Sequence, residues 1–217
     1  MGRKSILSVR EKEAPIFYSK ESQDKFVHFL LHRLLEMKEP GHFLDIGAYH
    51  PMTGNNTYFF EKNFGWKGVS IDISDRYAQE WYAVRKNPLL IEDATKVDYD
   101  ALLASLPTVI DYLSLDVDGV YDTVLERIPF SQHVFKVITI EHDYYRFGPL
   151  YRNQEREILK SHGYYLLCPD VTTNNAFFED WWVHPSAFPA DTLSKLQALD
   201  LHGKDHTHLI HTFESKL

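Results

Sequence analysis

The stretch Phe43-Leu44-Asp45-Ile46-Gly47-Ala48-Tyr49-His50 has the form of a buried strand that ends in an acidic residue and a glycine. In a parallel sheet covered by helices, ligands bind beyond the carboxyl ends of the strands, near the first strand. A glycine there permits a tight turn and the close approach of a ligand. Asp45 is a candidate either to orient this loop or to accept a hydrogen bond from a cationic group of the ligand. The stretch predicts a ligand-binding loop that includes Asp45, Gly47 and Ala48.

This loop does not match the common nucleotide-binding patterns. The dinucleotide fingerprint has glycines at its first, third and sixth positions, and counting from Gly47 the third and sixth positions are Tyr49 and Met52. The phosphate-binding pattern that ends in Gly-Lys-Ser or Gly-Lys-Thr is absent from the sequence. A nicotinamide cofactor and ATP are therefore disfavoured.

Apolar strand-like runs alternate with amphipathic stretches after this loop. The expected strands are residues 42–46, 69–73, 89–91, 110–116 and 134–141. The expected helices lie near residues 56–64, 76–85, 99–106 and 121–128. Strands separated by short helices favour an α/β fold, with a mostly parallel sheet and helices on both of its faces.

The two ends of the chain extend this pattern. Apolar residues from Phe26 to Met37 recur at helical spacing and predict an N-terminal helical extension over about 20–38, which ends before Pro40. After a helix at 152–161, strands at 164–168 and 177–183 have no obvious helix between them and allow an antiparallel pair at the sheet edge. Only one of two adjacent tryptophans in the second of these strands, Trp181 and Trp182, needs to reach the core, because side chains alternate along a strand.

The remaining residues are expected to form a helix at 191–199 and a polar C-terminal tail at about 200–217. The four tail histidines favour a polar segment or an intersubunit contact over a metal site, because no cysteine accompanies them. No linker interrupts the chain, so we expect one domain over residues 1–217. A homo-oligomer is compatible with this organisation.

Composition limits the partners and the compartment. The 217 residues are 44% hydrophobic and 25% charged, which is typical of a globular protein. No apolar run approaches the ~20 residues that span a bilayer, so no membrane span is expected. The net charge of -8 disfavours a nucleic-acid partner, because phosphate binding rests on lysine and arginine clusters. A single cysteine, Cys168, suits the reducing cytoplasm.

Acidic residues also end the second and third expected strands. Asp72 and Ile73 end the second, and a carboxylate at that position suits two neighbouring ribose hydroxyls. Asp93 and Ala94 follow the third, where Asp93 is a candidate to accept from an adenine amino group. Each acid alone is explained by a strand or helix cap, but three in succession at strand ends favour an adenosine cofactor.

Several stretches together resemble the FkbM family of S-adenosylmethionine-dependent methyltransferases. In chain order they are FLDIGAYH at 43–50, NTYFFE at 56–61, GWKG at 65–68, DYLSLDVDG at 111–119, ITIEH at 138–142 and FEDWWV at 178–183. The resemblance implies the Rossmann-like class I methyltransferase fold with a seven-stranded sheet, S-adenosylmethionine (SAM) as cofactor, and O-methylation of sugars or natural-product hydroxyls. It places Asp45 and Gly47 in the cofactor loop.

The sequence departs from the family pattern at three positions. Asp72 replaces the glutamate more usual at the ribose position, and Ile73 replaces the proline that often follows. Asp118 stands where a glutamate is common. Each acidic replacement keeps a carboxylate with a shorter reach.

Methyl transfer to a hydroxyl needs a group that removes its proton or a metal that stabilises the alkoxide. The expected strands 110–116 and 134–141 are neighbours at ~4.8 Å, so Asp116 and Glu141 should lie close together. His142 is the predicted general base, because imidazole titrates near neutral pH. For Asp116 the favoured role is to hold the methionyl amino group of SAM, and Glu141 and His142 can also form a structural pair.

Other residues near these strand ends have open roles. Asp116, Asp118, Glu141 and His142 are candidate ligands for Mg²⁺, which prefers carboxylates. Asp118 is equally explained as the start of a helix. His50 is a second candidate base or an exposed loop histidine. Candidates for an acceptor pocket, or for plain packing, are Tyr49, Tyr144, Tyr145 and Arg146.

The sequence thus predicts a SAM-dependent O-methyltransferase. Its acceptor is expected to be a small hydroxylated molecule, either a sugar or a sugar-bearing natural product. The alternatives are an N-methyltransferase and a non-catalytic SAM-binding interaction protein.

Overall fold

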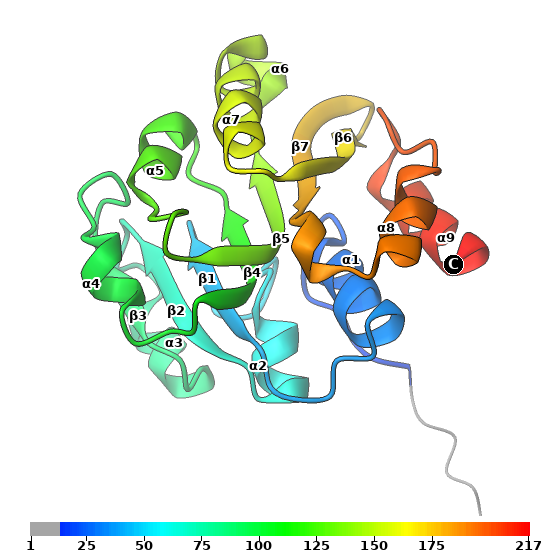
Figure 1. Ribbon diagram of the computed structural model, residues 1–217. Helices are drawn as coiled ribbons and strands as arrows, with labels where there is room; N and C mark the ends of the chain where they lie inside the picture. The colour runs from blue at the N-terminus through cyan, green and yellow to red at the C-terminus, as the bar shows by residue number, and fades with distance from the viewer. Residues whose placement is uncertain (1–13) are drawn as a thin grey trace, which may run out of the picture.

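The computed structural model describes residues 14–217. This part of the chain contains one seven-stranded sheet in the order β3-β2-β1-β4-β5-β7-β6 (Figure 1). The strands are β1 His42–Ile46, β2 Lys67–Asp72, β3 Leu89–Ile91, β4 Val109–Leu115, β5 Val134–Glu141, β6 Tyr165–Thr173 and β7 Ala176–Val183. The first five strands pair in parallel, whereas β7 runs antiparallel to β5 and to β6. The predicted mostly parallel sheet with an antiparallel pair at its edge is confirmed.

Helices cover both faces of this sheet, as predicted. They are α1 Gln23–His28, the π-helix η1 Phe29–Leu34, α2 Tyr58–Phe64, α3 Ala78–Val84, α4 Tyr99–Leu103, α5 Tyr121–Arg127, α6 Tyr144–Phe147, α7 Pro149–Ser161, the short 3-10 helix η2 Pro185–Ala187, α8 Ala190–Gln197 and α9 His206–Lys216. Side chains of α1, η1, α2, α8 and α9 pack in the core cluster on one face. Side chains of α4, α5 and α7 pack in the cluster on the other.

Consecutive strand residues contribute to opposite cores. Phe43 belongs to the first cluster and Leu44 to the second, and the same alternation separates Trp181 from Trp182. Both tryptophans are fully buried, so the expectation that only one would reach a core was too narrow. The reason is that β7 is an interior strand of the sheet, with helices on both of its faces.

The N-terminal extension packs against the C-terminal segment. Phe26 stacks on Trp181 with ring centroids 4.4 Å apart, and Phe29 stacks on Phe213 of α9 at 5.6 Å. Figure 1 shows α1, α8 and α9 together beside the β6–β7 end of the sheet. The expected polar tail thus contains a helix that packs on the core. In the part of the chain that the structure describes, no helix has the length and apolar character of a membrane span.

Candidate functional site

A cavity of about 890 Å³ opens at the carboxyl ends of the five parallel strands. Its volume lies in the range of small-molecule and cofactor sites. All eight predicted cofactor-binding residues line it, namely Asp45, Gly47, Ala48, Asp72, Ile73, Asp93, Ala94 and Asp116. Glu141 and Asp118 line it as well, but His142 is not among the lining residues. The strand ends are therefore brought together as the sequence predicts, with His142 as the exception.

Gly47 is required by the backbone around it. Its φ is +83°, and a Cβ atom there would overlap the backbone carbonyl oxygen of Asp116. The amide nitrogens of Gly47 and Ala48 donate to the carbonyl of Ile71 at 2.9 and 3.1 Å. The loop therefore passes close to β2 and β4 and leaves the space above it open.

Asp45 is buried beneath this loop and orients it. Its Oδ2 accepts hydrogen bonds from Thr57 Oγ1 at 2.9 Å and from Asn55 Nδ2 and Ser70 Oγ at 3.3 Å. Burial raises the pKa of the Asp45 carboxyl, while the charge of Arg85 opposes that rise. Of the two roles expected for Asp45, this geometry favours orientation of the loop.

Asp72 ends β2 with its carboxylate toward the cavity. Its Oδ2 accepts from the amide of Tyr49 at 2.7 Å, and its Oδ1 accepts from the amide of Ser74 at 2.8 Å. Each carboxylate oxygen has a second lone pair, so both oxygens retain capacity for hydroxyl donors. The adjacent Ile73 side chain is 74% exposed, which leaves an apolar surface beside this carboxylate.

Asp93 is held by its own turn. Its Oδ1 accepts from the amide and the hydroxyl of Thr95 at 3.0 and 2.7 Å, and its Oδ2 lies 3.1 Å from Lys96 Nζ. These donors hold the pKa of Asp93 at about 2, so it is ionised at neutral pH. Asp93 lines the cavity beside Ala94, with less free acceptor capacity than Asp72.

Asp116 and Glu141 lie together at the ends of β4 and β5, as predicted, and each carboxyl perturbs the pKa of the other. Asp116 is open to the cavity, yet the surrounding protein limits its hydration and raises its pKa to about 6. Burial and the neighbouring Asp116 raise the pKa of Glu141 to about 10. Two carboxyls in such contact cannot both ionise easily, so the pair retains one proton at neutral pH.

A third carboxyl, Glu179, lies behind this pair and was missed by the sequence analysis. It is directly opposite Glu141 in the β5–β7 pairing and is 2% exposed. Its Oε2 accepts from Gln23 Nε2 at 3.0 Å. Burial raises the pKa of Glu179, with further contributions from the charges of Asp116 and Glu21. The N-terminal segment thereby joins the site, because Glu21 and Gln23 both line the cavity.

Two other candidates have local partners. Asp118 has a side chain that is 83% exposed and paired with Arg146, and its φ of +53° precedes a helix that begins at Tyr121. His50 lines the cavity, but its Nδ1 accepts from two loop amides and its Nε2 lies 3.3 Å from Glu80 Oε1. Both imidazole nitrogens of His50 are therefore engaged.

Of the four acceptor-pocket candidates, two line the cavity and two do not. Tyr49 and Tyr145 line the cavity, whereas Tyr144 and Arg146 are not among its lining residues. Tyr144 packs against Phe177 and Arg152 instead. Two of these four candidates, Tyr49 and Tyr145, are therefore placed where they could contact a ligand.

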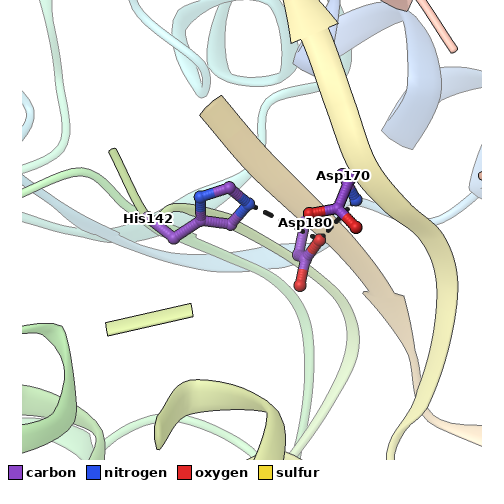
Figure 2. A group of neighbouring side chains, drawn as sticks. All are labelled: His142, Asp170 and Asp180. Atoms are coloured by element: carbon purple, nitrogen blue, oxygen red, sulfur yellow. Dashed lines mark hydrogen bonds and ion pairs between the residues drawn. The ribbon is translucent and has the colours of Figure 1, made fainter. Parts of the chain in front are cut away.

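His142 points away from the cavity, which does not fit the predicted general base. It is fully buried, its Nδ1 accepts from the amide of Tyr144 at 3.3 Å, and its Nε2 faces Asp180 Oδ1 at 3.7 Å (Figure 2). The physical reason is strand alternation, because Glu141 and His142 are consecutive and Glu141 faces the cavity. The alternative of a structural role for His142 fits this placement.

The predicted magnesium ligands are not gathered at one point, since His142 faces Asp180 and Asp118 pairs with Arg146. Within residues 14–217, the one group with metal-ligand spacing is His142, Asp170 and Asp180, which Figure 2 shows. Arg156 already binds both Asp180 oxygens at 2.6 and 2.8 Å, and Arg152 binds Asp170 at 2.8 Å. Guanidinium groups thus fill the cation positions of this group.

We predict that His142→Asn lowers stability but leaves the pH dependence of the expected methyl-transfer activity unchanged. Asparagine retains an acceptor for the Tyr144 amide, while the loss of the buried imidazole costs about 1–3 kcal/mol of unfolding free energy. Urea unfolding and a pH–rate profile measure the two effects. A loss of the acidic limb of the profile at unchanged stability would restore His142 as the base.

No family model and no curated protein matches the chain, so the resemblance to the FkbM family stays a prediction. Solved structures do match. A candidate rRNA methylase from Clostridium thermocellum is 14% identical, with 77% of this chain and 96% of that chain covered and a TM-score of 0.52. A candidate hemolysin from Lactococcus lactis is 10% identical, with 91% and 98% covered and a TM-score of 0.51. Together with the strand order, this similarity shows the Rossmann-like class I methyltransferase fold.

Proposed function

We propose that the protein is a SAM-dependent O-methyltransferase for a small hydroxylated acceptor, either a sugar or a sugar-bearing natural product. The observation that carries the proposal is a single cavity that joins the Gly47 loop and Asp72 to the neighbouring carboxyls of Asp116 and Glu141. The part of the cavity near Gly47 and Asp72 suits a nucleoside. The part near Asp116 and Glu141 suits removal of the acceptor's proton next to the transferred methyl group. We expect the protein to act in the cytoplasm.

The residues of the cavity fit SAM. No side chain fits at Gly47, because its Cβ would overlap the Asp116 carbonyl oxygen, and the free lone pairs of Asp72 suit ribose hydroxyls. Ile73 and Ala94 offer apolar contacts to an adenine ring, and Asp93 is placed to accept from its amino group. Asp116 is placed to accept from the methionyl amino group.

SAM supplies an electrophilic methyl group on a positively charged sulfur. The acceptor oxygen must lie in line with that methyl and lose its proton during the transfer. The ionised member of the Asp116–Glu141 pair accepts this proton, because it faces the cavity and its raised pKa makes it a stronger base than an ordinary carboxylate. Magnesium has no part in this proposal, since the residues predicted to hold it face different surroundings.

Replacement of Asp72 tests the proposed SAM-binding site. We predict that Asp72→Ala weakens S-adenosylhomocysteine (SAH) binding by about 10–100-fold, the loss expected for hydrogen bonds to a charged group. Asp75→Ala, an exposed neighbour that does not line the cavity, is the matched control. Calorimetry measures both. Equal affinities of the two variants would remove Asp72 from the ribose site.

The proposed O-methylation of a hydroxylated acceptor is tested by transfer of a labelled methyl group from SAM to candidate acceptors. Products that carry the label on oxygen support the proposal, and products labelled on nitrogen point to an N-methyltransferase instead. SAH binding without any transfer across a broad acceptor set supports the non-catalytic binding protein.

A further inference from the structure

The carboxyl groups of Asp116, Glu141 and Glu179 have no lysine or arginine ion-pair partner in the described part of the chain, unlike several other buried carboxyls. Glu61 is paired with Arg85, Asp111 with Lys136 at 2.7 Å, and Asp180 with Arg156. In contrast, the groups that perturb Asp116, Glu141 and Glu179 are other carboxyls and neutral donors. These three acids, two of which line the cavity, therefore have no cation of their own beside them.

Acids predominate among the charged residues that line the cavity. Within the described chain, its lining residues include eight acids, which are Glu21, Asp45, Asp72, Glu92, Asp93, Asp116, Asp118 and Glu141. The one lysine or arginine among the lining residues is Lys20. The Lys20 side chain is 81% exposed and lies 3.5 Å from Glu21, so it contributes little inside the cavity.

Glu21 adds a negative charge to the part of the cavity where the acceptor is proposed to bind, near Asp116 and Glu141. Its side chain is only 14% exposed, and its charge acts on the buried Glu179 behind the catalytic pair. The backbone fixes its position, because the Glu21 amide donates to Gln23 Oε1 at 3.2 Å and Gln23 in turn donates to Glu179. These bonds fix the backbone of Glu21 at the cavity wall.

From this arrangement we infer that the acceptor carries an ammonium group, bound by the Glu21 side of the cavity, beside the hydroxyl that reaches Asp116 and Glu141. The inference rests on the proposed methyltransferase function. SAM carries one net positive charge, which is less than the negative charge of the cavity wall. Negative charge therefore remains near Glu21, Asp116 and Glu141 to bind a second cation. Phosphate- or carboxylate-bearing acceptors meet repulsion from the same wall.

Three sugars of like size and different charge test this inference, namely glucosamine, glucose and glucuronate. Their affinities for the SAH-saturated protein are measured by saturation-transfer NMR titration. We expect glucosamine to bind at least about tenfold more tightly than glucose, the factor for one hydrogen bond to a charged group. Glucuronate should bind most weakly.

The variant Glu21→Gln should reduce the preference for glucosamine over glucose to less than about threefold, because it removes the charge and keeps the shape. Glu126→Gln, an exposed α5 residue outside the cavity, should retain the full preference. Equal binding of the three sugars, no binding of any, or an unchanged preference in the Glu21 variant would overturn the inference. If SAH itself does not bind, the proposed function fails rather than this inference. Calorimetry of SAH binding distinguishes these two failures.

Discussion

Gly47→Ala is expected to abolish cofactor binding. The new Cβ would overlap the carbonyl oxygen of Asp116, and both atoms belong to the backbone, so no side-chain rotation relieves the clash. The loop or the end of β4 must move, at a cost of about 3 kcal/mol or more in unfolding free energy. Because that movement displaces Asp116 and the amides of the loop, SAH affinity should fall by at least about a hundredfold.

A second glycine separates this clash from backbone strain. Gly65 also has a positive φ, of +66°, but a Cβ there meets nothing within 4 Å. Gly65→Ala should cost about 1–2 kcal/mol and leave SAH affinity unchanged. Calorimetry with circular dichroism to monitor the folded fraction compares the variants. Wild-type SAH affinity in Gly47→Ala would show that the cofactor does not approach this loop.

Asp116→Asn is expected to remove methyl transfer and to stabilise the protein. Asp116 is the ionised member of the pair at neutral pH, so its loss as general base lowers the rate by about 10²–10⁴-fold at saturating SAM. The amide cannot ionise, so it also removes the desolvation penalty of the Asp116 carboxylate; after allowance for solvent in the cavity, this gain is about 1 kcal/mol. Single-turnover rates and thermal unfolding measure the two effects.

A control at an exposed site completes this comparison. Glu126→Gln removes an exposed charge of α5 and should change neither the rate nor the stability by more than about 0.5 kcal/mol. An Asp116→Asn enzyme with wild-type turnover would exclude this carboxylate as the proton acceptor.

The pH dependence follows from the same pair. The pKa of Asp116 is raised to about 6, so the first free carboxylate appears as the pH rises through that value. Methyl transfer should therefore increase between about pH 5 and 7. Stability has the opposite sign, because a carboxyl with a raised pKa binds its proton more tightly in the folded state. Its stabilising contribution is present at low pH and is lost as the pH rises through the folded pKa. A flat rate profile across pH 5–7 would contradict this assignment.

The strand ends were predictable from sequence because each carries a local signal. An apolar run followed by an acid at Asp45, Asp72, Asp93 and Asp116 marks both the strand and the edge of the sheet where it ends. The neighbourhood of Asp116 and Glu141 followed from the order of parallel strands. The opposite directions of Glu141 and His142 also follow from strand alternation, which conflicts with the prediction that both side chains face the cavity.

The rest of the site depends on contacts between distant segments. Glu179 faces Glu141 only through the antiparallel register of β5 and β7, which no local pattern in the sequence specifies. Glu21 reaches the cavity because the N-terminal extension folds over the sheet and is held there by Gln23. The C-terminal helix was missed for a similar reason, since Phe213 is fixed by its contacts with Phe26 and Phe29.

Calorimetric titration of the unmodified protein with SAH, with NAD⁺ as the comparison ligand, tests the central claim most directly. The cavity at the strand ends predicts one SAH site per chain with a dissociation constant in the micromolar range, about −8 kcal/mol, and no NAD⁺ binding. Absence of SAH binding, or equal binding of NAD⁺, would contradict it.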